Sequence, residues 1–128
     1  MGTQYLIDSN AIIDYLSGVL PSKGMDFLDE IVNDIPPVSV ISKIEILGYT
    51  APPSAYQLLM NFMTDAEIIQ LSEAIVSRTI EIRKAYKIKL PDAIIAATAL
   101  VNGYTLVSRN LGDFEKIEGL IIIDPHSL

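Results

Sequence analysis

The chain has 128 residues, half of them apolar, so we expect a single domain with one hydrophobic core over residues 1–128. No apolar run approaches the ~20 residues of a membrane span, the opening residues predict no signal peptide, and the absence of cysteine fits a cytoplasmic protein. The net charge of −7 argues against a simple nucleic-acid coat, because contacts to phosphate dominate that kind of binding.

The first part of the chain predicts a strand followed by two helices. Residues 4–8 are expected to form the strand, and residues 10–17 form a short helix that Gly18 can end. Ser22 can cap a second helix, and Pro36-Pro37 stops its pattern.

The central part predicts a second strand at residues 37–41 and then a short helix. Residues 42–45 match a capping box for that helix, and Gly48 lies close to its end. After a break at Pro52-Pro53, residues 54–63 predict a helix with one buried face.

A third strand is expected at residues 67–71. Ser72 can cap a long helix that runs to about Tyr86, and Pro91 suits the first turn of the next helix, which ends at Asn102-Gly103.

Residues 104–108 and 120–123 predict the fourth and fifth strands, with a loop or single helical turn between them. Because strands and helices alternate, we predict an α/β fold, a three-layer sandwich with a central, mainly parallel five-stranded sheet flanked by helices.

Four acidic residues lie where predicted elements begin or end. They are Asp8, Glu45, Asp92 and Asp113. Each alone has a plain structural explanation, such as a cap, a first-turn acid or a turn residue. Together they are more specific, because the carboxyl ends of parallel strands meet at one edge of the sheet, where sites are built.

Such a gathering of carboxylates needs an opposing charge. Two carboxylates ~5 Å apart repel by roughly 3 kcal/mol at an effective dielectric constant of 20. A bound cation offsets this repulsion, and an all-oxygen ligand set selects Mg²⁺ or Mn²⁺ over zinc. With a single histidine and no cysteine, the sequence favours metal-assisted phosphodiester cleavage.

Other chemistries fit less well. His126 stands among the last three residues, where we expect a mobile terminal side chain rather than a catalyst. The chain has no Gly-rich phosphate loop. An aspartyl-phosphate mechanism at Asp8 would want an acid in place of Asn10.

Two further features each allow two interpretations. A cluster of basic residues is either a solvated helix end or a strip that holds a phosphate backbone; its members are Arg78, Arg83, Lys84, Lys87 and Lys89. The helix at residues 54–63 is either fully buried or a surface for a partner or second copy. Its large apolar side chains are Tyr56, Leu58, Leu59, Met60, Phe62 and Met63.

Four blocks of sequence resemble a small PIN-domain protein of the VapC toxin type, in order and over essentially the whole chain. The blocks are Asp8-Ser9-Asn10 with residues 12–16, residues 39–45, residues 90–97 and residues 106–114. The resemblance implies a Mg²⁺- or Mn²⁺-dependent endoribonuclease acting on RNA, a homodimer, and a partner antitoxin that blocks the site.

The resemblance also assigns roles to residues. Asp8, Glu45, Asp92 and Asp113 match the acidic quartet of the family, as catalytic residues and metal ligands. The supporting positions are Ser9 and Ser108 as small hydroxyls, where Thr is also common, Asn10 and Asn110 as hydrogen-bonding supports, and Arg109 as a cation that could meet phosphate.

Three alternatives stay open at this point. The first is a catalytically silent PIN-like module that binds RNA or protein, and the second is a phosphatase or other small-molecule hydrolase that uses the same carboxylates. The third, a structure-specific DNA nuclease, ranks lowest because the chain lacks room for an added helical arch.

Overall fold

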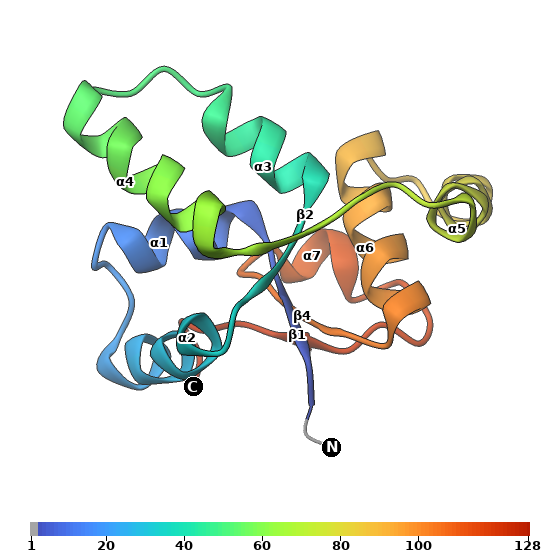
Figure 1. The fold of residues 1–128 in the computed structure, drawn as a ribbon. Helices are drawn as coiled ribbons and strands as arrows, with labels where there is room; N and C mark the ends of the chain where they lie inside the picture. Colours follow the sequence, from blue (N-terminus) through green and yellow to red (C-terminus); the bar gives the residue numbers. More distant parts are fainter. Residues whose placement is uncertain (1–2) are drawn as a thin grey trace.

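The computed structural model describes residues 3–128, so Met1 and Gly2, part of the opening read as free of a signal peptide, lie outside it. The strands are β1 (Tyr5–Ile7), β2 (Pro37–Ser39), β3 (Glu67–Ile69), β4 (Thr105–Val107) and β5 (Ile122–Ile123). The helices, shown in Figure 1, are α1 (Ser9–Leu16), α2 (Ser22–Asn33), α3 (Val40–Leu47), α4 (Pro53–Asp65), α5 (Glu73–Ala85), α6 (Leu90–Asn102) and α7 (Leu111–Phe114).

The expected α/β architecture with parallel strands flanked by helices is confirmed. β1 pairs with β4, β4 with β5, and β2 with β3, all of them in parallel register. One detail was wrong: the five strands are hydrogen-bonded as two sheets, β1-β4-β5 and β2-β3, although β1 and β2 lie side by side. The strands are only two or three residues long, and Pro37 at the start of β2 has no amide N–H to donate to a neighbouring strand.

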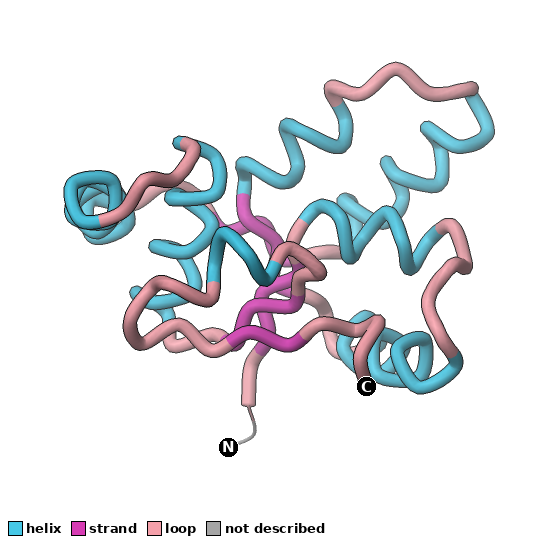
Figure 2. Tube along the Cα trace, turned by 180° about the vertical axis from the view of Figure 1, so that it is seen from behind, coloured by secondary structure: helices cyan, strands magenta, loops and turns pink. Residues whose placement is uncertain are grey.

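The core lies on both faces of the strands, as the central strands between helices in Figure 2 indicate. Side chains alternate along a strand, so Leu6 packs with the buried residues of α5, α6 and α7, whereas Ile7 packs with those of α1, α2 and α4. Leu106 and Val107 of β4 divide in the same way. Helices therefore cover both faces and leave the carboxyl ends of β1 and β4 for polar residues.

Several predicted helix ends are confirmed. Ser72 Oγ accepts a hydrogen bond from Ile75 N at 3.2 Å and caps α5. Gly103 ends α6 with a φ of 69°, a left-handed conformation that glycine adopts readily. Ser22 does not act as a cap, because it is the first residue of α2 and the cap position is Pro21.

The start of α3 also differs from the prediction. The helix begins at Val40, and Ser39 caps it by accepting a hydrogen bond from Ile41 N at 3.1 Å. Ser42, expected to open a capping box with Glu45, instead lies within the helix. Its hydroxyl is fully buried and has no hydrogen-bond partner among residues 3–128. The earlier start frees Glu45 from a capping role.

No helix within residues 3–128 is both long and apolar enough to cross a membrane.

The two serines predict opposite effects on stability. Ser39→Ala removes the cap of α3 and should lower the free energy of unfolding by about 1 kcal/mol. Ser42→Ala removes a buried hydroxyl without a partner and should raise that free energy by about 1 kcal/mol. Urea unfolding of both variants measures the difference. A loss of stability in Ser42→Ala with none in Ser39→Ala would contradict the observed start of the helix.

Candidate active site

Asp8 lies at the carboxyl end of β1 and caps α1. Its backbone N–H donates to Val107 O at 2.9 Å, which fixes it beside the end of β4. Its carboxylate accepts hydrogen bonds from Ser9 N at 2.8 Å, from Ser108 Oγ at 2.9 Å and from Asn10 Nδ2 at 3.1 Å. With only 5% of the residue exposed, Asp8 is a buried carboxylate held by three hydrogen-bond donors.

Glu45 is brought to the same place by α3. Ser9 Oγ donates to Glu45 Oε1 at 2.9 Å, so the residue that follows Asp8 joins the first turn of α1 to α3. The Glu45 side chain is exposed, in contrast to the buried Asp8. A glutamate interpreted as half of a capping box thus faces the end of β1.

Asp92 and Asp113 complete the group from α6 and α7. Asp92 lies in the first turn of α6 and Asp113 in α7. Asn110 Nδ2 donates to Asp113 Oδ2 at 3.0 Å, and Asn110 N donates to Ser108 Oγ at 3.0 Å. Ser108, which donates to Asp8, therefore also accepts from Asn110, the residue that donates to Asp113.

The acids influence one another electrostatically. Burial raises the pKa of Asp8 from 3.8 to about 6, hydrogen bonds from Ser108 and Ser9 oppose that change, and the charges of Asp92 and Glu45 add to it. Burial also raises the pKa of Asp92, as do the charges of Asp113 and Glu45, while Lys89 opposes the rise. The structure thus gathers the four acids named from the sequence at one edge of the strands.

The donor set fits a hard divalent cation. No Lys, Arg or His within residues 3–128 forms an ion pair with any of the four acids. Carboxylate oxygens are the ligands that Mg²⁺ and Mn²⁺ prefer, and a cation would offset the charges that raise the pKa of Asp8. In the described part of the chain, no three acidic or histidine side chains are already arranged around a common ion position.

The Arg109 side chain binds a carboxylate outside the group of four acids. Its backbone N–H donates to Asn10 Oδ1 at 3.1 Å, and its Nη1 lies 3.1 Å and 3.0 Å from the two carboxylate oxygens of Asp14. Sequence reasoning did not single out Asp14. Asp14 follows Asn10 by four residues, which places both on one face of α1, and this spacing could have indicated that Asp14 belongs to the site.

His126 is not a mobile terminal side chain, so that expectation was wrong. Its Nε2 lies 2.9 Å from Asp14 Oδ2, and its backbone N–H donates to Asp124 Oδ1 at 2.9 Å. The preceding Pro125 is buried against Gly24 of α2, where any Cβ would collide with the Pro125 carbonyl. Packing of the segment after β5 thus orders the histidine.

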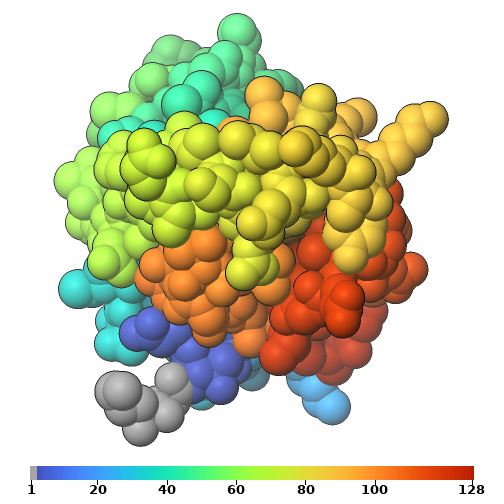
Figure 3. All heavy atoms as spheres, turned by 90° about the vertical axis from the view of Figure 1, so that its right-hand side faces the viewer, coloured from blue at the N-terminus to red at the C-terminus, as the bar shows by residue number. Residues whose placement is uncertain are grey.

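The basic cluster lies on α5 and the segment that follows it. Figure 3 shows α5 crossing this side of the molecule above α6. Arg78 pairs with Glu81 at 3.6 Å, and Arg83 Nη1 donates to Ile88 O at 2.9 Å. Arg83 and Lys84 occupy the last turn of α5, where cations are favoured. A role in holding a phosphate backbone stays a prediction.

α4 is not fully buried. Leu59, Phe62 and Met63 face the core, whereas the other three large apolar side chains are exposed. These are Tyr56 (37% exposed), Leu58 (47%) and Met60 (38%). The interpretation of a wholly buried helix is therefore wrong. Among the described residues, Leu58 is exposed on one flank of the buried face of α4, and Tyr56 and Met60 are exposed on the other.

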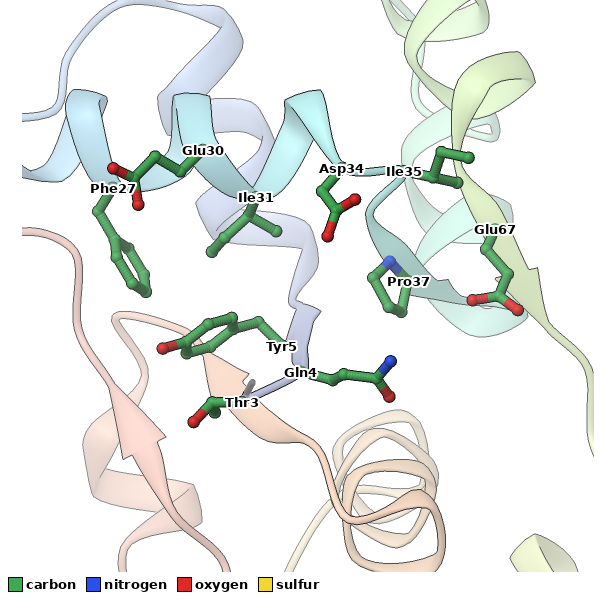
Figure 4. Close-up of a pocket in the computed structure, with 10 residues that line it drawn as sticks. All are labelled: Thr3, Gln4, Tyr5, Phe27, Glu30, Ile31, Asp34, Ile35, Pro37 and Glu67. Atoms are coloured by element: carbon green, nitrogen blue, oxygen red, sulfur yellow. The ribbon is translucent and has the colours of Figure 1, made fainter. Parts of the chain in front are cut away.

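A pocket lies at the opposite, amino ends of the strands. Figure 4 shows Tyr5, Phe27, Ile31 and Pro37 along its wall with carboxylates around it. The residues at the starts of β1, β2 and β3 line it, so it is remote from Asp8. The acids instead lie at the open edge of the strands, and the pocket is separate from them.

Comparison with known proteins identifies the family. The PIN domain model matches residues 5–120, and the chain belongs to the PIN domain family. A chain of a toxin–antitoxin complex from Klebsiella pneumoniae is 30% identical, with a TM-score of 0.74, over 98% of this chain and 100% of that one.

Two further solved structures share the fold. DNA-bound VapBC from Salmonella typhimurium contains a chain with 22% identity and a TM-score of 0.82, over 97% of this chain and 99% of that one. FitAcB from Neisseria gonorrhoeae contains a chain with 20% identity and a TM-score of 0.78, over 98% and 100%. A comparison with curated proteins gives no match. The chain is thus a PIN domain that resembles VapC toxins.

The raised pKa of Asp8 predicts a specific pH dependence of stability. Because the folded pKa of about 6 exceeds the unfolded value of 3.8, this group's stabilising contribution is full below the unfolded pKa and is lost as pH rises through about 6. The loss is about 3 kcal/mol.

The measurement is unfolding by urea in EDTA, at pH values from about 4 to 7, for the natural chain and for Asp8→Asn. The natural chain should lose stability relative to the variant as pH rises. A difference that is constant with pH, or that moves in the opposite direction, would contradict the raised pKa.

Proposed function

We propose that this chain is a Mg²⁺- or Mn²⁺-dependent endoribonuclease that cleaves RNA phosphodiester bonds with a metal-activated water, as the toxin of a toxin–antitoxin pair. The observation that carries the proposal is the group of four interacting carboxylates at the carboxyl ends of the strands of a PIN domain, with no basic side chain paired to any of them within residues 3–128. PIN domains are generally nucleases and typically use divalent metals, which supports this reading.

Asp8 and Asp92 would be the principal ligands, directly or through water, and Glu45 and Asp113 would complete the set. When bound, the cation supplies a water of lowered pKa and neutralises charge on the scissile phosphate. Glu45 is exposed, and within residues 3–128 its carboxylate accepts one hydrogen bond, from Ser9 Oγ, so it can still orient the attacking water or take its proton.

The neighbouring polar residues hold the acids in orientation. Ser108 Oγ and Asn10 Nδ2 both donate to Asp8 Oδ2, and Ser9 N donates to Oδ1. Asn110 does the same for Asp113. A carboxylate fixed by several donors keeps its remaining lone pairs directed at one position, which is what a rigid ligand set requires.

The partners follow from the relatives and from α4. Chains of similar fold occur in toxin–antitoxin complexes, which supports an antitoxin that binds this chain and blocks the site. The exposed apolar side chains of α4, Tyr56, Leu58 and Met60, support a homodimer or another protein contact. RNA is the substrate, and the proposed location is the cytoplasm.

Cleavage of a mixed RNA pool by purified protein tests the activity. The natural chain should cut in Mg²⁺ or Mn²⁺ and not in EDTA, and Asp8→Asn should abolish cutting while leaving the fold intact. Asp26→Asn, an exposed aspartate of α2, is the matched control and should cut as the natural chain does. Full activity in Asp8→Asn would refute the assignment of the site.

A melting experiment with Mn²⁺ tests the ligand set independently of any RNA. A ligand at a hundred times its Kd adds about 2.7 kcal/mol to the free energy of unfolding. Mn²⁺ should therefore raise the Tm of the natural chain and of Asp26→Asn but not of Asp8→Asn. No shift and no cutting would favour a catalytically silent PIN-like module that binds RNA or protein.

The α4 surface predicts self-association. Light scattering of the natural chain should give the mass of a dimer, and Leu58→Glu, which replaces the most exposed of these apolar side chains by a charge, should shift the mass toward the monomer. Gln57→Glu adds the same charge beside it on the same exposed stretch of α4 and should have a smaller effect. A natural chain that stays monomeric at high concentration would refute self-association.

A further inference from the structure

Arg109 is fixed by one face of α1. Asn10, in the first turn, accepts from the Arg109 backbone N–H at 3.1 Å, and Asp14, one turn later, binds the guanidinium through Nη1 at 3.0 and 3.1 Å. Asn10 also donates to Asp8 Oδ2. The same helix face therefore positions the arginine and the central carboxylate of the proposed ribonuclease site.

Asp14 is buried, whereas the arginine it binds is not. The Asp14 side chain is 8% exposed and that of Arg109 is 56% exposed. Nε and Nη2 of Arg109 donate to no other residue within 3–128. An arginine bound through a single nitrogen keeps the rest of its donor fork available for a planar or tetrahedral anion such as phosphate.

His126 also contacts the Asp14 carboxylate. Its Nε2 lies 2.9 Å from Asp14 Oδ2, the oxygen that Arg109 approaches at 3.0 Å. Its backbone is fixed by Asp124, which also accepts from Ser127 Oγ at 3.2 Å. A carboxylate in contact with both a histidine and an arginine cannot rotate freely, so the arginine keeps one orientation.

We propose that Asp14 and His126 are positioning residues that hold Arg109 in place to bind an RNA phosphate beside the carboxylate group. The inference rests on the proposed ribonuclease function and adds two residues to it. Arg109 directly follows Ser108, whose hydroxyl donates to Asp8, and its backbone N–H donates to Asn10, which also donates to Asp8, so the residue borders the site. Ordering the side chain before RNA arrives removes an entropic cost of binding, which is how a pre-formed contact increases affinity.

The competing explanation is that the contacts of Asp14 with Arg109 and His126 only stabilise the fold. An exposed arginine in an ion pair contributes little to stability, and a buried ion pair is weak evidence for stability in general. In that case, removing these contacts would change the Tm without changing the affinity for RNA. The two explanations are therefore separated by measuring affinity and melting on the same variants.

The probe is a fluorescein-labelled single-stranded RNA pool of random sequence, because a phosphate contact carries no sequence information. Its Kd is measured in EDTA, where metal-dependent cutting does not occur. Arg109→Ala should weaken binding roughly fivefold and reduce the slope of log K against log salt by about 0.7. His126→Ala and Asp14→Asn should weaken binding in the same direction, because the arginine is then no longer held.

His126→Gln is the conservative variant. Its amide can donate to Asp14 and should restore much of the affinity lost in His126→Ala. Ser127→Ala is the matched control in the same segment. It loses the hydrogen bond from Ser127 Oγ to Asp124 and should bind RNA as the natural chain does.

The decisive measurement is His126→Ala in an Arg109→Ala background. If His126 acts through Arg109, adding His126→Ala to the Arg109→Ala variant changes the Kd for RNA less than about twofold. The same addition should still change the Tm by as much as His126→Ala changes it in the natural chain. Additive losses of affinity would overturn the proposal, and so would unchanged affinity in Arg109→Ala or absence of RNA binding by the natural chain. Cutting of mixed RNA in Mg²⁺, measured in parallel, reports on the proposed function separately.

Discussion

Mutual repulsion among the carboxylates is the constraint around which the open edge of this fold is built. Asp8 is almost completely buried at the end of β1, yet it faces the charges of Asp92 and Glu45. Three donors hold it, and each comes from a different kind of group: a backbone amide, an amide side chain and a hydroxyl. Without these donors, a carboxylate this deeply placed would be protonated or would turn toward water.

The two-sided core makes that arrangement possible. Alternating side chains of β1 and β4 bury Leu6 and Leu106 toward one set of helices and Ile7 and Val107 toward the other. Both strand ends are thereby held in place, and the next residue along each, Asp8 and Ser108, is polar and buried, with the Ser108 hydroxyl donating to the Asp8 carboxylate. In parallel α/β proteins, sites usually lie just outside the carboxyl ends of the strands.

Much of this could be predicted from the sequence because the relevant signals are local. Ser72 and Gly103 mark helix ends through bonds to residues one turn away, and the acids follow strand-like runs directly. The start of α3 was misplaced because two serines three residues apart both suit a cap, and only tertiary burial of Ser42 decides between them.

The contacts of Asp14 with Arg109 and His126 could not be predicted, because they join residues far apart in the chain. Asp14 meets Arg109 and His126 across 95 and 112 residues of chain, and no local pattern records a contact at that separation. The division of the strands into two sheets likewise depends on which backbone groups meet after folding. Short strands leave few pairs to determine the outcome.

The contact between Gly24 and Pro125 connects the back of α2 to this edge. Gly24 has an ordinary helical conformation, so its lack of a side chain serves the close approach of the Pro125 carbonyl and not a turn. Any larger residue there would force the final segment outward and carry His126 away from Asp14. A substitution at position 24 would therefore act on the active-site edge through the chain end, although residue 24 belongs to a different element from any of the four acids.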